Sequence, residues 1–192
     1  MSGATEHENF ASVEEIYQGL LARAPEHRMA PRLDAMQLAG SALGDPHRSA
    51  PGVQVTGTNG KTSTARMVES LLLAHDLRVG RYTSPHLERV TERISIDGEP
   101  VSDETFVRIY TEIAPYLDLV DRHLEGEGAP RLTYFETLTV LAFAVFADEP
   151  VDVMVLEVGI GGSWDATTVA DAAVSVVTPI DLDHTDILGD TV

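Results

Sequence analysis

The sequence predicts an α/β fold in which helices cover both faces of a mostly parallel sheet. Short apolar segments that suit buried strands alternate along the chain with longer segments of helical periodicity. Strands without an alternating polar face are typical of a parallel sheet, because helices cover both of its faces. A hydrophobic content of 43% with 23% charged residues also indicates a folded domain and argues against disorder.

The first 50 residues are expected to form a helical segment that precedes the sheet. Apolar residues at helical spacing follow Ser12, and Glu15 lies three positions further on, so a capping box predicts a helix over residues 12–24. A second helix is expected over residues 33–43, because a Gly-Asp-Pro sequence follows it. The N-terminus is acidic and lacks an apolar run, so it does not resemble a signal peptide.

The remaining residues, 51–192, are expected to form the domain that contains the sheet. Strands are predicted over residues 53–55, 77–82, 94–96, 151–158 and 174–177. Helices are predicted over residues 62–75, 102–117 and 132–147, with an acidic connector over residues 118–130. The apolar residues on one side of the first of these helices are Met67, Val68, Leu71 and Leu72.

Composition excludes several classes of function. The chain has 31 acidic and 13 basic residues, a net charge of −18, which argues against a nucleic-acid partner. It has no cysteine, which excludes disulfides and thiolate metal sites, and its longest apolar stretch, residues 138–147, is too short to span a membrane. We therefore expect a cytoplasmic, monomeric protein that binds small molecules, and a small anion remains possible because one lysine and a metal ion can dominate a local field.

A glycine-rich stretch between a predicted strand and a predicted helix indicates a phosphate site. Its residues are Gly57, Thr58, Asn59, Gly60, Lys61, Thr62 and Ser63. Glycines allow backbone N–H groups to turn toward an anion, a lysine reaches the β- and γ-phosphates, and the neighbouring hydroxyl can face Mg²⁺. Lys61 is the only lysine beside 12 arginines, and a compact ammonium suits a cramped loop better than a guanidinium. Because Val55 stands where the usual motif has its first glycine, the match is partial, and a glycine turn with an exposed lysine is the alternative.

Three polar residues are expected at the same edge of the sheet, beyond the carboxyl ends of its strands. Glu157 ends the strand over residues 151–158, Ser84 follows the second strand, and His184 follows the last one. Together they could hold a metal ion, because each residue type carries an oxygen or nitrogen ligand. Taken singly, a surface acid, a proline turn and a solvated acidic loop explain them as well.

Together, the motifs resemble those of one family in their order along the chain. They are GTNGKTS, SPHL followed by Glu92-Arg93-Ile94, TYFE, EVGIGG with Asp165-Ala166-Thr167, and LDHTD. This order is similar to that of dihydrofolate synthase/folylpolyglutamate synthase, the folate branch of the Mur ligase superfamily. Val55 in the glycine-rich loop is the form found in Mur ligases. The resemblance therefore implies a P-loop NTPase-like central domain, truncated at its C-terminal end.

The resemblance also implies a reaction and the residues that perform it. ATP would phosphorylate a carboxylate of dihydropteroate or of a folate's glutamate tail, and the amine of L-glutamate would then displace phosphate to form an amide. Lys61 and the loop amides would bind ATP. The implied Mg²⁺ ligands are Ser84, Glu157, His184 and Thr62, with Lys61, Glu157 and His184 as the catalytic residues. The implied pterin-site residues are Thr133, Phe135 and Asp165.

Two alternatives stay open from the sequence. One is another Mur-type ligase that acts on a cell-wall precursor or a polyamide, against which SPHL and TYFE argue. The other is a non-catalytic module that binds Mg-ATP, which would not need Ser84 and His184 near one ion. In the family a carbamylated lysine and a C-terminal glutamate-ligase domain complete the site, and neither is present here, so this chain alone is expected to be inactive.

Overall fold

The structure, a computed structural model, describes residues 10, 12–24 and 32–191. Its centre is a six-stranded sheet in the order β4-β3-β2-β5-β1-β6. The parallel strands are β1 (Gly52–Thr56), β2 (Val79–Tyr82), β5 (Val153–Glu157) and β6 (Val174–Val177). The antiparallel strands β3 (Ile94–Ile96) and β4 (Glu99–Pro100) extend the sheet beyond β2. The prediction of a mostly parallel sheet is confirmed.

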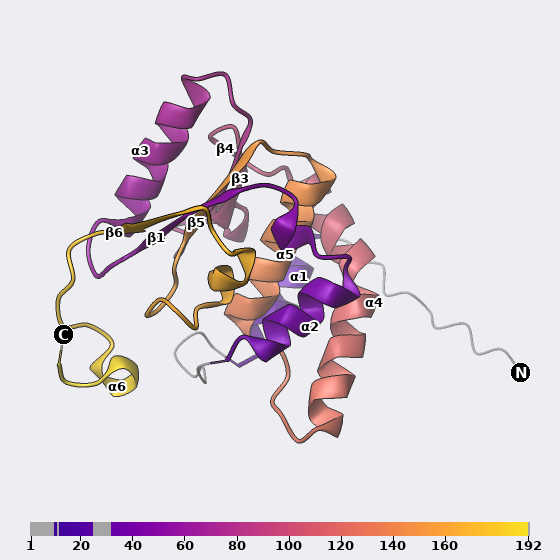
Figure 1. Ribbon diagram of the computed structural model, residues 1–192. Coiled ribbons are helices and arrows are strands. Elements are labelled where there is room, and N and C mark those ends of the chain that lie inside the picture. Colours follow the sequence, from indigo (N-terminus) through magenta and orange to yellow (C-terminus); the bar gives the residue numbers. More distant parts are fainter. Residues whose placement is uncertain (1–9, 11, 25–31, 192) are drawn as a thin grey trace, which may run out of the picture.

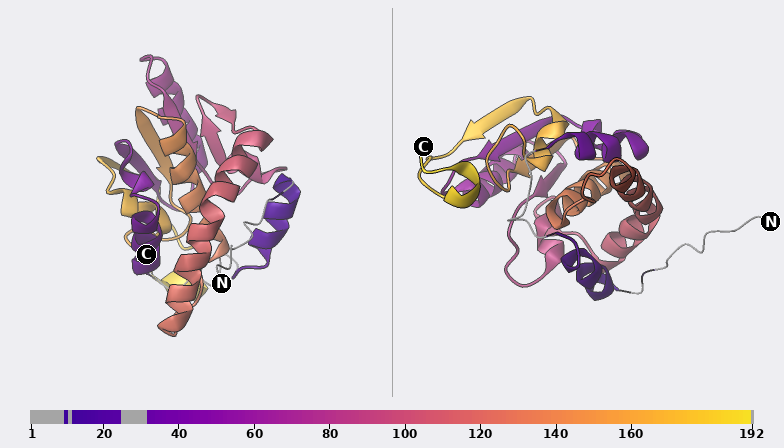
Figure 2. Two further views of the ribbon diagram at one scale, coloured as in Figure 1. Left: turned by 90° about the vertical axis from the view of Figure 1, so that its right-hand side faces the viewer. Right: turned by 90° about the horizontal axis from the view of Figure 1, so that it is seen from below.

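Helices cover both faces of the sheet, as predicted (Figures 1 and 2). Helix α3 (Lys61–Leu73) packs on one face, against β1, β2 and β5. Helix α5 (Tyr134–Asp148) packs on the other, and α4 (Asp103–Gly126), α1 (Val13–Leu21) and α2 (Asp34–Ala42) surround it. The short helical segments are η2 (Pro46–Arg48), η3 (Val90–Arg93), η4 (Ala166–Ala170) and α6 (Thr185–Leu188).

Helix α5 is the centre of the apolar core. Its sequence is apolar on every side, which is typical of a helix enclosed by other elements, and it lies between the sheet and the outer helices. A capping box of Thr133 and Glu136 begins it. On the sheet side, Gly80 of β2 allows Phe146 to come so close that a Cβ there would lie 2.5 Å from the ring. The absence of a side chain at Gly80 therefore lets α5 pack closely against the sheet.

The two N-terminal helices share this core. Ile16 and Leu20 of α1 and Met36 of α2 are buried in the same apolar cluster as α4 and α5. Ser12 accepts a hydrogen bond from the N–H of Glu15, which confirms the predicted cap. The division into residues 1–50 and 51–192 stays a prediction. Among the described helices, none is long and apolar enough to cross a membrane.

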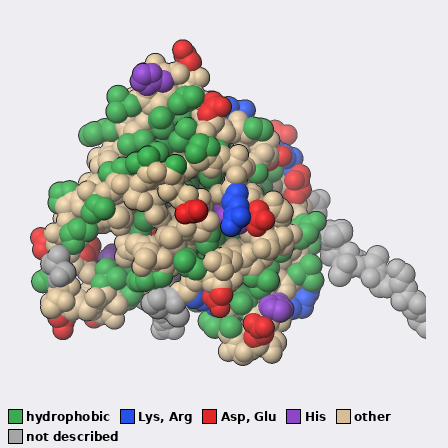
Figure 3. All heavy atoms as spheres, in the orientation of Figure 1, with side chains coloured by type: hydrophobic (Ala, Val, Ile, Leu, Met, Phe, Trp, Pro, Cys, Tyr) green, Lys and Arg blue, Asp and Glu red, His purple; other side chains and the backbone are tan. Residues whose placement is uncertain are grey.

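Two details of the predicted helices were wrong. Helix α4 continues to Gly126 through most of the expected connector, because Leu117, Val120 and Leu124 keep an apolar side at helical spacing and are buried. Of the four apolar residues that the sequence places on one side of α3, Val68 and Leu72 pack against the core, while Met67 and Leu71 are exposed. Figure 3 shows hydrophobic side chains gathered over this helix and the neighbouring edge of the sheet.

Candidate functional site, a cavity at the carboxyl edge of the sheet

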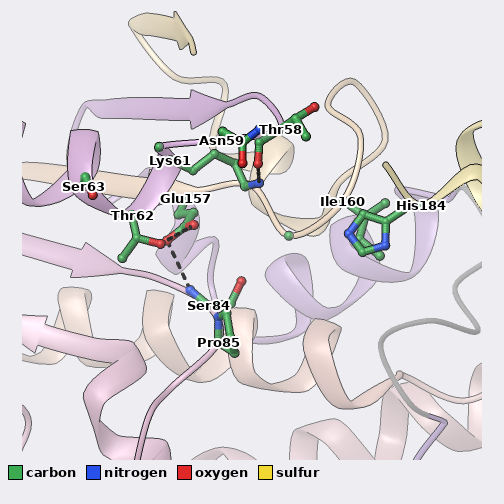
Figure 4. Close-up of a pocket in the computed structure, with 12 residues that line it drawn as sticks. Thr58, Asn59, Lys61, Thr62, Ser63, Ser84, Pro85, Glu157, Ile160 and His184 are labelled. Atoms are coloured by element: carbon green, nitrogen blue, oxygen red, sulfur yellow. Dashed lines mark hydrogen bonds between the residues drawn. The ribbon is translucent and has the colours of Figure 1, made fainter. Parts of the chain in front are cut away.

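A cavity of about 510 Å³ opens where β1, β2 and β5 end and α3 begins (Figure 4). Its lining residues come from four segments that are far apart in the sequence. They are Thr58, Asn59, Gly60, Lys61, Thr62, Ser63, Ser84, Pro85, Glu157, Gly159, Ile160 and His184. The structure thus brings together the glycine-rich loop and the three polar residues that were expected at this edge. Gly57 lines a smaller cavity beside it.

The glycine-rich loop has a backbone that requires glycine at two positions. Gly57 has a φ of 134° and lies against Thr178, where a Cβ would overlap the threonine side chain. Gly60 has a φ of 85° and is the N-cap residue of α3, with no side chain capping the helix. The first residues of α3 line the cavity, and no side chain caps the N–H groups at this helix end, which suits an anion.

The loop differs in one respect from the predicted anion nest. The N–H groups of Thr58 and Asn59 both donate to the carbonyl oxygen of Pro179, at 3.0 and 3.4 Å. The hydroxyl of Thr58 donates to the carbonyl of Asp181 and accepts from its N–H. These bonds anchor the loop to the segment after β6. The N–H groups at the start of α3 are therefore the ones available to a phosphate.

Lys61 lies at the first position of α3, with its ammonium folded back along the loop. Its Nζ donates to the carbonyls of Gly57 and Thr58, at 2.8 and 3.3 Å (Figure 4). These carbonyls hold the positive charge beside the helix N-terminus, where it can meet an anion together with the helix dipole. The ammonium group bonds carbonyls only three and four positions away, and a compact group suits this confined place better than a guanidinium would.

Thr62, Ser84 and Glu157 form one hydrogen-bonded cluster. The Thr62 hydroxyl donates to Glu157 Oε1 at 2.8 Å, and the Ser84 backbone N–H donates to Oε2 at 3.3 Å. Glu157 is 2% exposed, and this burial raises the pKa of its carboxyl group, against the opposing effect of those two hydrogen bonds and of the Lys61 charge. A buried carboxylate held by so few donors is suited to a cation.

His184 lines the cavity from its far side. Figure 4 shows its ring apart from the Thr62–Ser84–Glu157 cluster. It is the N-cap residue of α6 with a φ of 49°, and about half of its side chain is exposed. Of the expected ligands, the structure therefore groups three closely and leaves the histidine facing them across the cavity.

The donor set fits Mg²⁺ in its chemistry. Thr62 and Glu157 supply hydroxyl and carboxylate oxygens, which are the ligand types that this hard cation prefers. In the described part of the chain, no three His, Asp or Glu side chains form a group that could hold a metal by themselves. An ion here would consequently keep waters or phosphate oxygens among its ligands, as Mg²⁺ commonly does.

The three residues expected to contact a pterin are buried. Thr133 caps α5, and Phe135 is 1% exposed with its ring beneath Gly159, where a Cβ would lie 2.7 Å away. Asp165 is wholly buried, and both of its oxygens accept hydrogen bonds from within the chain. Burial raises the pKa of Asp165, while its four hydrogen bonds act in the opposite direction. In this structure Phe135 and Asp165 support the loop over residues 159–162.

Two contacts around that loop were not anticipated from the sequence. Gln54 Nε2 donates to the hydroxyls of Thr167 and Thr168, at 2.9 Å in both cases. The Thr56 hydroxyl donates to the carbonyl of Gly161 at 2.8 Å. A polar Gln54 in the middle of a short buried strand was the available signal, because such a side chain requires partners.

The chain is similar to known proteins over most of its length. The family model described as "Mur ligase middle domain" matches residues 55–191. The chain is 49% identical over 185 residues to a dihydrofolate synthase/folylpolyglutamate synthase of Mycobacterium tuberculosis, covering 95% of this chain and 38% of that protein. It therefore spans well under half the length of that relative.

Solved structures show the same similarity. A Mycobacterium tuberculosis folylpolyglutamate synthase complexed with ADP and AMPPCP superimposes with a TM-score of 0.86 and 47% identity, covering 95% of this chain and 39% of the other. A structure described as an FPGS-AMPPCP-folate complex gives a TM-score of 0.83 and 38% identity, covering 93% of this chain and 43% of the other. At these identities, the likeness extends beyond the fold to the sequence.

Proposed function

Because this chain belongs to the Mur ligase family, we propose that it is the ATP-binding part of a ligase that joins L-glutamate to dihydropteroate, to the glutamate tail of folates, or to both. The observation that carries the proposal is the cavity, which places Lys61, the start of α3 and Glu157 around one space. The relatives support the substrate class, since they are folylpolyglutamate synthases, one solved with AMPPCP and folate. The whole protein's reaction would form an acyl phosphate, which the amine of glutamate then attacks.

Within that reaction, the residues of this chain bind and orient the nucleotide. Lys61 and the first N–H groups of α3 would hold the phosphates and offset the negative charge of the transferred group. Gly60 leaves room for phosphate oxygens, because a Cβ there would meet no other atom within 4 Å. The hydrogen bonds from Thr58 and Asn59 to Pro179 keep the loop in place before the nucleotide binds.

A Mg²⁺ ion, when bound, would neutralise charge on the phosphates and on the developing acyl phosphate. We propose that Thr62, Ser84 and Glu157 hold it from one side of the cavity, and that His184, which lies apart from them, faces it from the other side. Glu157 would bind as the ionised carboxylate. The oxygen of Thr62 would then offer a lone pair to the ion. A hydroxyl can do this by rotating its proton away from the carboxylate while the oxygen stays in place.

The pterin side of the site is proposed to depend on Thr133, Phe135 and Asp165. Phe135 lies beneath Gly159, and Asp165 accepts the N–H groups of Gly159 and Ile160, so both residues shape the loop that lines the cavity. A direct contact between Asp165 and a pterin would require part of this network to be exchanged. We also propose that the protein is a cytoplasmic monomer whose partners are small molecules. Its net charge of −18 argues against nucleic acid as a partner.

The test uses protein expressed from the complete reading frame. ADP release is followed with Mg-ATP and L-glutamate, while dihydropteroate, tetrahydrofolate or no acceptor is offered. Release that needs both glutamate and a pterin supports the proposal, and the acceptor used shows which activity is present.

The same assay on Lys61→Ala supplies the control for the nucleotide site. Loss of the ammonium should lower turnover by about 10²-fold or more, because it removes charge stabilisation from the phosphoryl transfer. Lys61→Arg keeps the charge and tests the cramped loop, where we expect only partial recovery. ADP release that ignores every pterin would contradict the folate assignment, and release that survives Lys61→Ala would contradict the nucleotide site.

A further inference from the structure

A buried ion pair lies behind the cavity. In the described part of the chain it forms no hydrogen bond with the ligands proposed above, although the charge of Arg81 acts to lower the pKa of Glu157. Arg81 on β2 and Glu69 on α3 are 4% and 5% exposed, and Arg81 Nε donates to Glu69 Oε2 at 2.7 Å. Charged side chains are seldom buried to this extent unless they are paired, and burying such a pair is costly. The pair is therefore a feature that requires an explanation.

The pair is part of a network that joins three elements. Arg81 also donates through NH1 to the hydroxyl of Thr83 at 3.0 Å, in the loop that follows β2. The hydroxyl of Ser95 on β3 donates to the second oxygen of Glu69 at 3.3 Å. One guanidinium thus connects the middle of α3 to the start of the Ser84 loop, and Glu69 connects both to the neighbouring strand.

This network runs parallel to the cluster at the cavity. Thr62 and Glu69 are seven positions apart on α3, which is about two turns, so they face the same side of the helix. Thr62 bonds Glu157 at the end of β5, while Glu69 bonds Arg81 on the adjacent strand. Thr83 precedes Ser84, whose N–H donates to Glu157. The two polar links therefore fix the same helix to the same pair of strands, one at the site and one behind it.

Stability alone does not account for such a pair. Removing two charges from water costs several kcal/mol per ion, and well-packed apolar residues of similar volume often serve equally well or better. What apolar side chains cannot supply is the bond to Thr83, since a guanidinium can donate in two fixed directions at once. Arg81 therefore contributes the placement of residues 83–84 relative to α3, in addition to its charge near Glu157, and only the first contribution depends on the Thr83 hydroxyl.

We propose that Arg81 and Glu69 are positioning residues, which hold the Ser84 loop and Thr62 in the arrangement that binds a magnesium–nucleotide complex. The inference rests on the proposed function, because it concerns the metal-facing half of the same cavity. The phosphate-facing half, with Lys61 and the glycine-rich loop, should depend on the pair much less. This difference separates positioning from a general loss of folding.

The experiment measures binding of a fluorescent ATP analogue to the full-length protein, first without a divalent cation and then with increasing Mg²⁺. In Arg81→Met, we expect the Mg²⁺ concentration for half-maximal effect to rise about tenfold, the lower end of what loss of a residue behind metal ligands costs. The affinity for the analogue without Mg²⁺ should change by less than about twofold. Lys61 and the glycine-rich loop would still bind the phosphates, and they lie apart from the substituted side chain. Protection of the Ser84 amide from hydrogen exchange should fall in the same variant.

Arg78→Met is the matched control. Arg78 directly precedes β2 and pairs with Glu149 at 2.7 Å, at the end of the strand away from the cavity, so the substitution removes the same groups from another ion pair. It should leave the Mg²⁺ dependence and the Ser84 amide unchanged. Equal behaviour of Arg78→Met and Arg81→Met would overturn the inference.

Two further variants keep the test decisive if Arg81→Met folds poorly. Glu69→Leu combined with Arg81→Met removes both charges, and we expect its unfolding midpoint to stay near that of the wild type while the Mg²⁺ response remains weakened. Thr83→Val should weaken the response with the ion pair intact, and Thr83→Ser should restore it. A wild-type response in the double variant or in Thr83→Val would refute the positioning role. A wild-type protein that binds the analogue with no Mg²⁺ dependence would instead refute the proposed metal site.

Discussion

Replacing Asp165 by asparagine tests how the loop over residues 159–162 is held. Asp165 Oδ2 accepts the N–H groups of Gly159 and Ile160 at 2.9 and 3.2 Å. Its Oδ1 accepts the N–H and the hydroxyl of Thr167 at 2.9 and 2.6 Å. All four groups are donors, so the site is built for two carboxylate oxygens. Asparagine keeps the shape but turns one oxygen into an NH₂ donor.

The magnitude follows from which oxygen is replaced. An NH₂ in place of Oδ2 would face two backbone N–H groups, whereas in place of Oδ1 it would face one N–H of Thr167, whose hydroxyl can turn to accept. The second orientation is cheaper and leaves one buried donor unsatisfied, at about 1–3 kcal/mol. For a domain of this size, this corresponds to a fall in Tm of roughly 2–12 °C.

Urea denaturation followed by circular dichroism measures this difference. The matched control is Asp171→Asn, because Asp171 is exposed and has a φ of 48°, a backbone conformation that asparagine tolerates. The control should unfold within about 0.5 kcal/mol of the wild type. If Asp165→Asn unfolds at the same urea concentration as Asp171→Asn, the four hydrogen bonds do not stabilise the fold and the reasoning is refuted.

Two further substitutions test the packing and the titration of the core. Gly159→Ala should cost about 1–3 kcal/mol of stability by overpacking against Phe135, whose ring would lie 2.7 Å from the new Cβ. In a double-mutant cycle, Phe135→Leu should relieve part of that cost. If the costs of the two substitutions simply add, the contact is contradicted. His47 is 4% exposed, no described residue bonds its Nδ1, and burial lowers its pKa, so only the unfolded chain takes up its proton just below pH 6.5. The contribution of His47 to the free energy of unfolding should therefore be complete above pH 6.5 and fall as the pH decreases below it. Between pH 7.5 and 5.5, His47→Gln should lose less of its free energy of unfolding than the wild type. Replacement of the exposed His75, in His75→Gln, should leave the wild-type pH dependence unchanged.

Local sequence was sufficient for the elements that carry the nucleotide loop. A strand, two glycines that adopt positive φ, and a lysine at the start of a helix all lie within ten residues, so no distant contact is needed to specify them. The same holds for the cap at Ser12, where the side chain accepts the N–H three residues later. These predictions were confirmed because their physical causes are local.

The extent of α4 shows where local reading failed. The acidic residues after Leu117 suggested an end, yet the helix continues to Gly126. Asp121 in that stretch is 1% exposed and accepts hydrogen bonds from Arg131 and from the Leu132 N–H, besides an ion pair with Arg23. A charge that reads as solvent-exposed in the sequence is instead the partner of distant residues, and only the packed structure supplies them.

The sequence by itself determined the succession of strands and helices along the chain and the phosphate loop, because periodicity, caps and glycine conformation act over a few positions. It also determined the edge of the sheet at which polar residues would gather. Tertiary structure decided which of those residues meet. It placed Thr62 and Ser84 on Glu157, left His184 across the cavity, and turned Asp165 and Phe135 inward beneath a loop. The physical reason is that a buried polar group must find its partners among residues that the chain brings together only when the sheet and its helices pack.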